Sequence, residues 1–501
     1  MSGRSRPAAI SGIGKVLIAN RGEIAVRVAR TLERLGLASA ALVHPADADG
    51  PAARAVDEVC PIEGGTPVAA HLDAEQIVEI ARRIGADAIH PGYGFLAENA
   101  AFAERVEAAG IRFVGPGPEV IRLMGDKIAS RRFVAEQGGP LTPSASEEDE
   151  PATFAERARE LGFPLLVKAS AGGGGKGMQI VREADALAQA IELARSEARR
   201  SFGDERLYAE RYVERPRHVE VQILADQHGH VLHLGERDCS IQRRFQKLVE
   251  ETPAPGLAPG LRARILDQAV SIARAAGYRN AGTVEFVLAP DGAFYFLEMN
   301  TRLQVEHPVT ELVTGLDLVE QQLRIAAGEP LAFGQEDVRF EGHAIECRIC
   351  AEDPEAEFRP AIGPLLRVQP ASGEGVRNDL GIAEGQSVTA AFDPMLGKVI
   401  AHGADRDEAI ARLRRALRET VILGCTTNTS WLERVLGHPD FGAGRVQTGF
   451  VVEHAAALAA PAPDARTRAV VLAAAALSDR DFQERVAAVP EPFASIGDWR
   501  N

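Results

Sequence analysis

The chain has 501 residues, which is too long for one compact core and enough for roughly two to four domains. Its hydrophobic fraction of 46% and charged fraction of 25% are ordinary for globular proteins, and its formal net charge of −15 argues against general nucleic-acid binding. No apolar run reaches the roughly 18 residues of a membrane helix, and no secretory signal precedes the first strand, so we expect a cytoplasmic protein.

The first elements predict a parallel sheet. A strand in KVLIAN precedes the stretch RGEIAVRVARTLERLG, whose apolar residues recur at helical spacing, and the apolar run ASAALV follows. A second helix and strand then lead into the glycine-rich turn PGYGFLAEN. Alternating strands and helices form a parallel sheet, and ligands bind at the carboxyl ends of its strands. We predict a Rossmann-like domain over 12–125 and a connecting helical segment over 126–142.

A smaller module is expected over 143–213. It runs from the strand PLLVKAS through the loop AGGGGKGM to a second strand, a long helix and the strand LYAERYV. Amides of consecutive glycines can approach phosphate oxygens without interference from Cβ atoms. The loop does not fit the P-loop pattern, because Lys176 is followed by Gly177. It could be a plain hinge, but the flanking lysines favour a lid that covers phosphates.

Lysine is scarce, since six lysines accompany fifty arginines. A compact, flexible ammonium can serve where a rigid guanidinium fork cannot, so each retained lysine marks a position of interest. The six are Lys15, Lys127, Lys168, Lys176, Lys247 and Lys398.

The stretch GTVEFVLAPDGAFYFLEMN predicts a β-hairpin, because Asp291-Gly292 lies between two alternating strands. With a two-residue turn, Glu285 and Glu298 lie opposite each other on one face, with Cβ atoms about 5 Å apart. Two such carboxylates repel, and Mg²⁺ brought by a nucleotide would relieve the repulsion. Asn300 continues on the same face. The alternative is a three-residue loop that offsets the pair and leaves each glutamate in its own salt bridge.

Polar side chains are dense in the loop NTRLQVEHP that follows this hairpin. The loop suits a small oxyanion, although solvated surface loops share its composition. In the later strand HAIECRI, Glu346 and Arg348 lie on the polar face, so Arg348 could be a cleft cation or an ion-pair partner of Glu346. The polar residues of the loop are Arg302, Gln304, Glu306 and His307.

Taken together and in this order, the segments resemble the biotin carboxylase family, the ATP-grasp component of acyl-CoA and pyruvate carboxylases. The resemblance extends from about Lys15 to about His454. It implies an α/β and α+β multidomain protein, with an N-terminal Rossmann-like parallel-sheet domain, an ATP-grasp lid and a C-terminal mixed-sheet catalytic domain over 214–455. Residues 456–501 would be a linker and the start of a following domain or tail. The segments are KVLIANRGEIAVR, HPGYGFLAEN, MGDK, KASAGGGGKGM, RHVEVQ, ERDCSIQRR, EMNTRLQVEHPVTE, ECRI and DPMLGKVI.

The resemblance implies an ATP-dependent ligase that carboxylates biotin with bicarbonate. It implies that Mg²⁺ or Mn²⁺ binds to Glu285, Glu298 and Asn300. It assigns ATP to Lys127, Lys168, Glu210, His218 and Gln242, with Gly172, Gly173, Gly174, Gly175, Lys176 and Gly177 closing over the phosphates.

The same resemblance implies a site for bicarbonate and biotin. Glu306 would take the proton of bicarbonate, which attacks the γ-phosphate to give carboxyphosphate. This intermediate would yield CO₂ and phosphate, the phosphate would take the ureido proton of biotin, and Arg348 would stabilise the biotin enolate. Tyr93 and Asp393 match positions near the biotin pocket. Bicarbonate would be held by Lys247, Arg302, Gln304 and the amide of Val305.

Two residues depart from the family pattern. Phe245 stands where the family usually has histidine, and Phe392 stands where a tyrosine is common. A phenyl ring cannot donate the hydrogen bond that either residue could make.

The implied partners are a biotin carrier and a carboxyltransferase subunit. The chain has no Ala-Met-Lys-Met biotinylation motif, so the carrier is expected on another chain or on a further portion of this one. The final GDWRN resembles the start of the β-barrel domain of longer α subunits, which suggests a truncated chain. The family commonly forms dimers or larger assemblies, and no feature indicates a nucleic-acid or membrane partner.

Two other functions fit part of these features. An ATP-grasp ligase joining a carboxylate to an amine would share the lid and the paired glutamates, but it would not explain the NTRLQVEHPVTE loop together with Arg348. A catalytically weakened regulatory subunit that binds nucleotide is the alternative of a different class, with Phe245 marking the weakened site.

Overall fold

The computed structural model describes residues 10–170 and 178–478. A compact unit ends at Leu458, and a separate C-terminal segment contains helix α18 (Ala465–Ser478). The predicted glycine loop, Gly172 to Gly177, and the final GDWRN lie outside the described residues. No helix within 10–170 or 178–478 is both long and apolar enough to cross a membrane.

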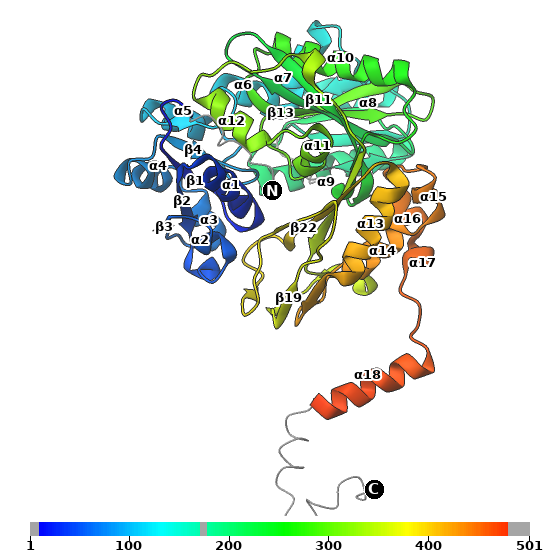
Figure 1. Ribbon diagram of the computed structural model, residues 1–501. Helices are drawn as coiled ribbons and strands as arrows, with labels where there is room; N and C mark the ends of the chain where they lie inside the picture. The colour runs from blue at the N-terminus through cyan, green and yellow to red at the C-terminus, as the bar shows by residue number, and fades with distance from the viewer. Residues whose placement is uncertain (1–9, 171–177, 479–501) are drawn as a thin grey trace, which may run out of the picture. The chain divides into compact units, whose positions relative to one another are not determined.

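The N-terminal part contains a five-stranded parallel sheet, drawn in blue in Figure 1. Its first strand is apolar and almost wholly buried, as expected for a parallel sheet covered by helices. The predicted Rossmann-like sheet is confirmed. The strands are β1 (Lys15–Ile18), β2 (Ala38–Val43), β3 (Glu58–Pro61), β4 (Ala88–His90) and β5 (Arg112–Phe113), in the spatial order β3-β2-β1-β4-β5. The helices are α1 (Gly22–Leu35), α2 (Pro51–Arg54), α3 (Pro67–His71), α4 (Ala74–Arg83) and α5 (Ala100–Ala108).

Two helices, α6 (Pro118–Gly125) and α7 (Lys127–Glu136), lead to a small antiparallel sheet. Helix α9 (Leu187–Phe202) packs on this sheet with α8 (Phe154–Glu160) at its edge. The order β6-β9-β7-β8 brings Lys168, at the end of β7, close to Glu210 on β9. The strands are β6 (Ser144–Ser146), β7 (Leu165–Ala169), β8 (Gln179–Val181) and β9 (Leu207–Arg211).

The largest element is an eight-stranded sheet. It is antiparallel throughout, where the sequence predicted a mixed sheet, because successive strands along the chain mostly pair as hairpins. The strands are β10 (Arg217–Ala225), β11 (Val231–Arg243), β12 (Gln246–Thr252), β13 (Asn280–Leu288), β14 (Phe294–Asn300), β15 (His343–Cys350), β20 (Val376–Leu380) and β22 (Met395–Gly403). Their spatial order is β14-β13-β10-β11-β12-β15-β22-β20.

Helices cover this sheet, and short strand pairs follow it. Helix α10 packs beside β10 and β11, and α13 packs on β22 (Figure 1). The helices are α10 (Pro259–Ala275), α11 (His307–Thr314), α12 (Leu318–Ala326), α13 (Arg406–Glu419), α14 (Thr429–Leu436), α15 (Pro439–Gly442), α16 (Phe450–Glu453) and α17 (Ala455–Leu458). The short strands are β16 (Glu352–Asp353), β17 (Arg359–Pro360), β18 (Gly363–Pro364), β19 (Arg367–Gln369), β21 (Ser387–Val388) and β23 (Val421–Leu423).

The hairpin of β13 and β14 pairs Glu285 with Glu298, as predicted, but through a different turn. Near the turn Val287 pairs with Tyr295, which leaves a three-residue loop closed by Gly292 at a φ of 86°. Leu297 has no partner across the hairpin, so it forms a bulge that restores the predicted register beyond it. The two-residue turn was wrong and the glutamate pair is confirmed, because the bulge compensates for the longer loop.

Candidate active site

A cavity of about 460 Å³ lies over the large antiparallel sheet. It brings together most of the predicted site residues, although they come from segments far apart in the sequence. Glu306 and Glu210 are not in its wall: Glu306 is buried beneath it, and Glu210 lines a pocket of about 100 Å³ beside it. The predicted residues in the wall are Tyr93, Lys127, Lys168, His218, Gln242, Lys247, Glu285, Glu298, Asn300, Arg302, Gln304, Val305, Arg348 and Asp393.

Lys247 lies at the centre of a group of carboxylates. Its Nζ is 2.5 Å from Glu220, 2.7 Å from Glu285 and 2.7 Å from Glu306. Burial disfavours the ammonium, but these three carboxylates together raise the pKa of Lys247 well above its usual value. One cation therefore links the predicted metal ligand Glu285 to the predicted base Glu306.

Glu306 is fully buried and bound by two cations. Its Oε1 contacts Lys247, and its Oε2 accepts a hydrogen bond of 2.9 Å from Nη2 of Arg348. Burial opposes the charge, yet Lys247, Arg348 and Arg237 hold the pKa of Glu306 well below its usual range. The carboxylate is ionised beneath a cavity whose wall carries positive charge, which suits an anionic substrate.

Arg348 lines the cavity. Of the two alternatives predicted for it, a cleft cation or an ion-pair partner of Glu346, the structure has the first. Arg348 donates through its Nε to Glu250 at 2.6 Å, while its other contact is with Glu306. Glu346, the alternative partner, has no hydrogen-bond partner among the described residues for either carboxylate oxygen. Burial raises the pKa of Glu250 to about 7, against the opposing effect of Arg348.

Glu285 is surrounded by hydrogen-bond donors. Its Oε1 accepts hydrogen bonds of 2.8 Å from Asn300 and 2.9 Å from Gln304, in addition to its contact with Lys247. Nε2 of His218 lies 2.8 Å from its other oxygen. Burial works against the charge, but Lys247 and His218 lower the pKa of Glu285 well below its usual value. Glu298, across the hairpin, contacts Lys127 instead.

Arg302 fixes the amide side chains of the loop after the hairpin. It donates to Gln304 at 3.0 Å and to Asn300 at 3.0 Å, and its Nε donates to Glu98 at 2.8 Å. Both amides therefore turn their nitrogen atoms towards Glu285. Glu98 comes from the glycine-rich turn of the N-terminal sheet, so this turn contributes directly to the cavity.

The opposite end of the cavity joins the small antiparallel sheet. Lys168 and Arg131 both bind Glu210, with Nη1 of Arg131 2.9 Å from the carboxylate. Burial opposes ionisation, but the two cations lower the pKa of Glu210 to about 2. The amide nitrogen of Gln242 lies 2.8 Å from Nδ1 of His218 and donates a hydrogen bond of 2.7 Å to the carbonyl oxygen of Cys239, which fixes Gln242 beside the His218 ring.

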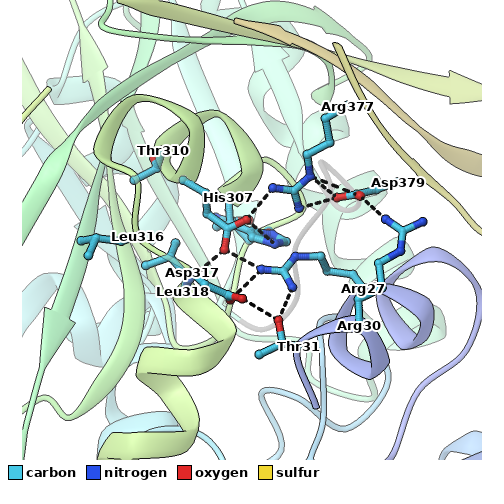
Figure 2. Close-up of polar contacts among 12 residues, drawn as sticks. Arg27, Arg30, Thr31, His307, Thr310, Leu316, Asp317, Leu318, Arg377 and Asp379 are labelled. Atoms are coloured by element: carbon cyan, nitrogen blue, oxygen red, sulfur yellow. Dashed lines mark hydrogen bonds and ion pairs between the residues drawn. The ribbon is translucent and has the colours of Figure 1, made fainter. Parts of the chain in front are cut away.

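The helix that follows Glu306 is fixed by a buried ion network, drawn in Figure 2. Glu311 on α11 forms two ion pairs: its Oε1 lies 2.6 Å from Nη2 of Arg27 on α1, and its Oε2 lies 2.7 Å from Nη1 of Arg377 on β20. Asp317 also binds Arg27 at 2.8 Å. Two segments far apart in the chain, α1 and β20, thus hold α11 in place, and with it the residue at its N-terminus.

Sequence reasoning missed several charged residues of the site. Glu220 lies opposite Glu285 across β10 and β13, and both Lys247 and the fully buried Arg237 bind it. Its spacing of two residues from His218 placed both on one face of a strand. Glu98 and Glu250 gave no such local signal, because their partners come from distant segments.

A Rossmann-like parallel sheet, a small antiparallel sheet and a large antiparallel sheet that meet around one cavity define an ATP-grasp protein. Three sequence families match the chain: "Biotin carboxylase, N-terminal domain" over 12–121, "Carbamoyl-phosphate synthase L chain, ATP binding domain" over 126–333, and "Biotin carboxylase C-terminal domain" over 346–453.

Similar proteins of known name support the same family. The biotin carboxylase of Halalkalibacterium halodurans is 50% identical over 445 residues, which are 88% of this chain and 97% of that protein. The mitochondrial methylcrotonoyl-CoA carboxylase subunit alpha of Dictyostelium discoideum is 43% identical over 98% of this chain and 71% of its own length. The solved biotin carboxylase domain of the Hydrogenobacter thermophilus 2-oxoglutarate carboxylase, in complex with MgADP, ADP and bicarbonate, superimposes with a TM-score of 0.88 at 43% identity, covering 90% of this chain and all of that one. The chain belongs to the biotin carboxylase family, so the predicted class of ATP-dependent ligase is confirmed.

Proposed function

We propose that this cavity carries out the ATP- and bicarbonate-dependent carboxylation of biotin on a carrier protein. The observation that carries the proposal is the grouping of Lys247, Arg302 and Arg348 around the buried carboxylate of Glu306. Three cations can hold a small anion, and the ionised carboxylate beside them can accept the proton of that anion. The bicarbonate in the related 2-oxoglutarate carboxylase domain supports this assignment.

Nucleotide binding is proposed for the other end of the cavity. Lys127 and Lys168 supply positive charge there, and the smaller pocket beside them is lined by Glu210, His218 and Gln242 together with apolar side chains. An apolar slot next to two ammonium groups suits an adenine base with its phosphates. The role of the glycine loop and Lys176 in covering those phosphates stays a prediction.

Mg²⁺ is proposed to bind Glu285, Glu298 and Asn300. Their side-chain oxygens are the hard ligands that this cation prefers, and two carboxylates face each other across the hairpin. Bound there, Mg²⁺ would neutralise charge on the transferring phosphate. Lys127 and Lys247 offset the charge of the two glutamates in the structure, which supports a site for a cation at this pair.

We propose for these positions the reaction that the family resemblance implies. Lys247, Arg302, Gln304 and the amide of Val305 hold bicarbonate, and Glu306 accepts its proton as an oxygen of bicarbonate attacks the γ-phosphate. ADP leaves and carboxyphosphate forms. Its cleavage gives CO₂ and phosphate, the phosphate takes the proton of the biotin ureido nitrogen, and this nitrogen attacks CO₂ while Arg348 stabilises the enolate.

The partners follow from the reaction. A biotin carrier must enter near Tyr93 and Asp393, which line both the main cavity and a neighbouring cavity of about 210 Å³. We further propose a carboxyltransferase subunit that transfers the carboxyl group to an acyl-CoA, and a homodimer or larger assembly. The cytoplasmic location and the domain limits at 125, 142, 213 and 455 stay predictions.

ATP hydrolysis by the purified chain tests this function. Hydrolysis is expected to require bicarbonate, to increase with free biotin, and to yield carboxybiotin that can be detected with labelled bicarbonate. A rate of ATP hydrolysis that does not depend on bicarbonate but increases when an amine is added would favour a carboxylate-amine ligase. Binding of ATP without any hydrolysis would favour a regulatory subunit.

Replacing Phe245 by histidine is expected to improve the activity. Phe245 lies at the second position of a two-residue turn between β11 and β12, lines both pockets and is 44% exposed. We expect Phe245→His to lower the KM for ATP about three- to tenfold, because the ring could then donate to a phosphate. Steady-state kinetics at saturating bicarbonate measure this. Phe340→His is the control, because Phe340 lines neither pocket. An unchanged KM for ATP in Phe245→His would argue against the phosphate contact.

A further inference from the structure

Lys398 is a retained lysine without a role in the proposed reaction. It lies on β22 and is fully buried. Its Nζ donates to the carbonyl oxygen of Val305 at 2.7 Å and lies 3.1 Å from Oε1 of Glu23 on α1. The ammonium therefore connects a strand of the large sheet, the first helix of the N-terminal part and the loop that leads into Glu306.

A buried ammonium is costly unless charged groups compensate it. Burial disfavours the charge, but Glu23, Glu346 and Asp379 raise the pKa of Lys398 above its usual value. Burial raises the pKa of Glu346 well above its usual range, and neither of its carboxylate oxygens has a hydrogen-bond partner among the described residues. The direct contacts of the Lys398 ammonium are with Glu23 and the Val305 carbonyl, while Asp379 adds a favourable charge nearby. A charged donor makes a stronger hydrogen bond than a neutral one.

The carbonyl that Lys398 holds belongs to the peptide bond between Val305 and Glu306. The preceding carbonyl, that of Gln304, accepts a hydrogen bond of 2.7 Å from Nδ1 of His307. Two consecutive carbonyls are therefore fixed from the protein side. The orientation of these peptide planes determines where the amide of Val305 points and where the side chain of Glu306 begins.

The other contact of Lys398 leads towards biotin. The hydroxyl of Tyr93 donates to Oε1 of Glu23, the same oxygen that faces Lys398. Burial and the negative charge of Glu23 raise the pKa of Tyr93 well above its usual value, so the hydroxyl keeps its proton. Tyr93, Glu23, Lys398 and Val305 form a continuous polar chain from the biotin side of the cavity to the bicarbonate loop.

We propose that Lys398 and Glu23 are positioning residues of the reaction, which hold the Val305–Glu306 peptide bond in the orientation that bicarbonate requires and couple it to the Tyr93 hydroxyl. Neither residue lines the main cavity with its own side chain. The inference rests on the proposed roles of Val305 and Glu306 in the reaction. It also explains why an ammonium is kept here in an arginine-rich chain, since a guanidinium is larger and would displace the carbonyl.

The test compares Lys398→Gln with Lys15→Gln. Lys15 is a matched control, because its Nζ also binds a glutamate, Glu58, and a backbone carbonyl, that of Ile84, but in the N-terminal sheet away from the cavity. Lys398→Gln is expected to raise the KM for bicarbonate about tenfold and to lower kcat several-fold, with the Kd for MgADP within about twofold of the wild type. Lys15→Gln is expected to change stability only.

A double-mutant cycle tests the coupling. Tyr93→Phe removes only the hydroxyl, and its effect on the KM for bicarbonate should be smaller in the Lys398→Gln background than alone. If Lys398→Gln does not fold, Glu23→Gln replaces it, because it keeps the shape and an acceptor but removes the charge that faces the ammonium.

A wild-type KM for bicarbonate in a folded Lys398→Gln or Glu23→Gln variant would overturn the positioning role. Independent effects in the cycle would overturn the coupling to Tyr93. Absence of bicarbonate-dependent hydrolysis in the wild type would instead refute the proposed function, so the two failures are distinguishable.

Discussion

Replacing Glu306 by glutamine is expected to lower bicarbonate-dependent ATP hydrolysis and biotin carboxylation by about 10³-fold. Glutamine keeps the shape of the side chain and can still accept a hydrogen bond from Arg348, but it cannot take a proton. Nucleotide binding should stay within about twofold of the wild type, because Glu306 is not in the wall of the cavity. Single-turnover hydrolysis and MgADP titration measure the two quantities separately.

The two cations bound to Glu306 affect its strength as a base. In the structure Lys247 and Arg348 hold the pKa of Glu306 well below its usual range, and a carboxylate of such low pKa is a weak base. Bicarbonate and biotin must therefore draw these cations away before the proton can move. We expect no acidic limb from Glu306 in the pH profile of kcat/KM for bicarbonate down to about pH 5, because this group is already ionised there in the free enzyme.

A matched variant separates the base from a general loss of stability. Glu251 is a buried glutamate on β12, bound by Arg406 and by His343 at 2.8 Å, on the far side of the sheet from the cavity. Glu251→Gln should lower the melting temperature at least as much as Glu306→Gln, yet keep most of the activity. Activity of Glu306→Gln within tenfold of the wild type would refute its role as the base.

The sequence was most informative where contacts are local. Alternation of side chains along β13 and β14 placed Glu285 opposite Glu298, and this pairing is present. The turn chemistry alone gave the wrong loop length, because Asp291-Gly292 fits a three-residue loop as well as a two-residue one. The bulge at Leu297 had no signal in the sequence, so the correct pair followed from two differences that cancel.

The sequence was least informative where charges meet from distant segments. Glu98, Glu220 and Glu250 contact Arg302, Lys247 and Arg348, but 27 to 204 residues separate the partners. The order of strands in the large sheet brings Glu220 and Glu250 to their partners, and the packing of the N-terminal part brings Glu98 to Arg302, so both depend on the whole fold. The family resemblance supplied the substrate-binding residues, whereas the carboxylates that compensate their charge had to come from the structure.

Replacing Glu285 by glutamine is expected to have the second largest effect, a decrease of about 100-fold or more in kcat/KM for MgATP together with a raised requirement for free Mg²⁺. Glu285 is the middle residue of a row of carboxylates, with Glu220 on β10 and Glu298 on β14 as its direct neighbours across the sheet. Its loss removes one of the three proposed metal ligands and one of the three anionic partners of Lys247. Glu298→Gln should have a smaller effect, because its side chain is 26% exposed and contacts only Lys127 among the described cations.

Thermal stabilisation by nucleotide measures this effect without relying on turnover. MgADP should raise the melting temperature of the wild type more than ADP with a chelator does, and the difference should vanish in Glu285→Gln, because a ligand stabilises only the state that binds it. The control is Glu236→Gln, a buried glutamate of β11 bound by Arg262 at 2.7 Å outside the cavity, which should keep the magnesium-dependent difference. An intact difference in Glu285→Gln would place the metal elsewhere, and Glu285 would then serve to hold Lys247.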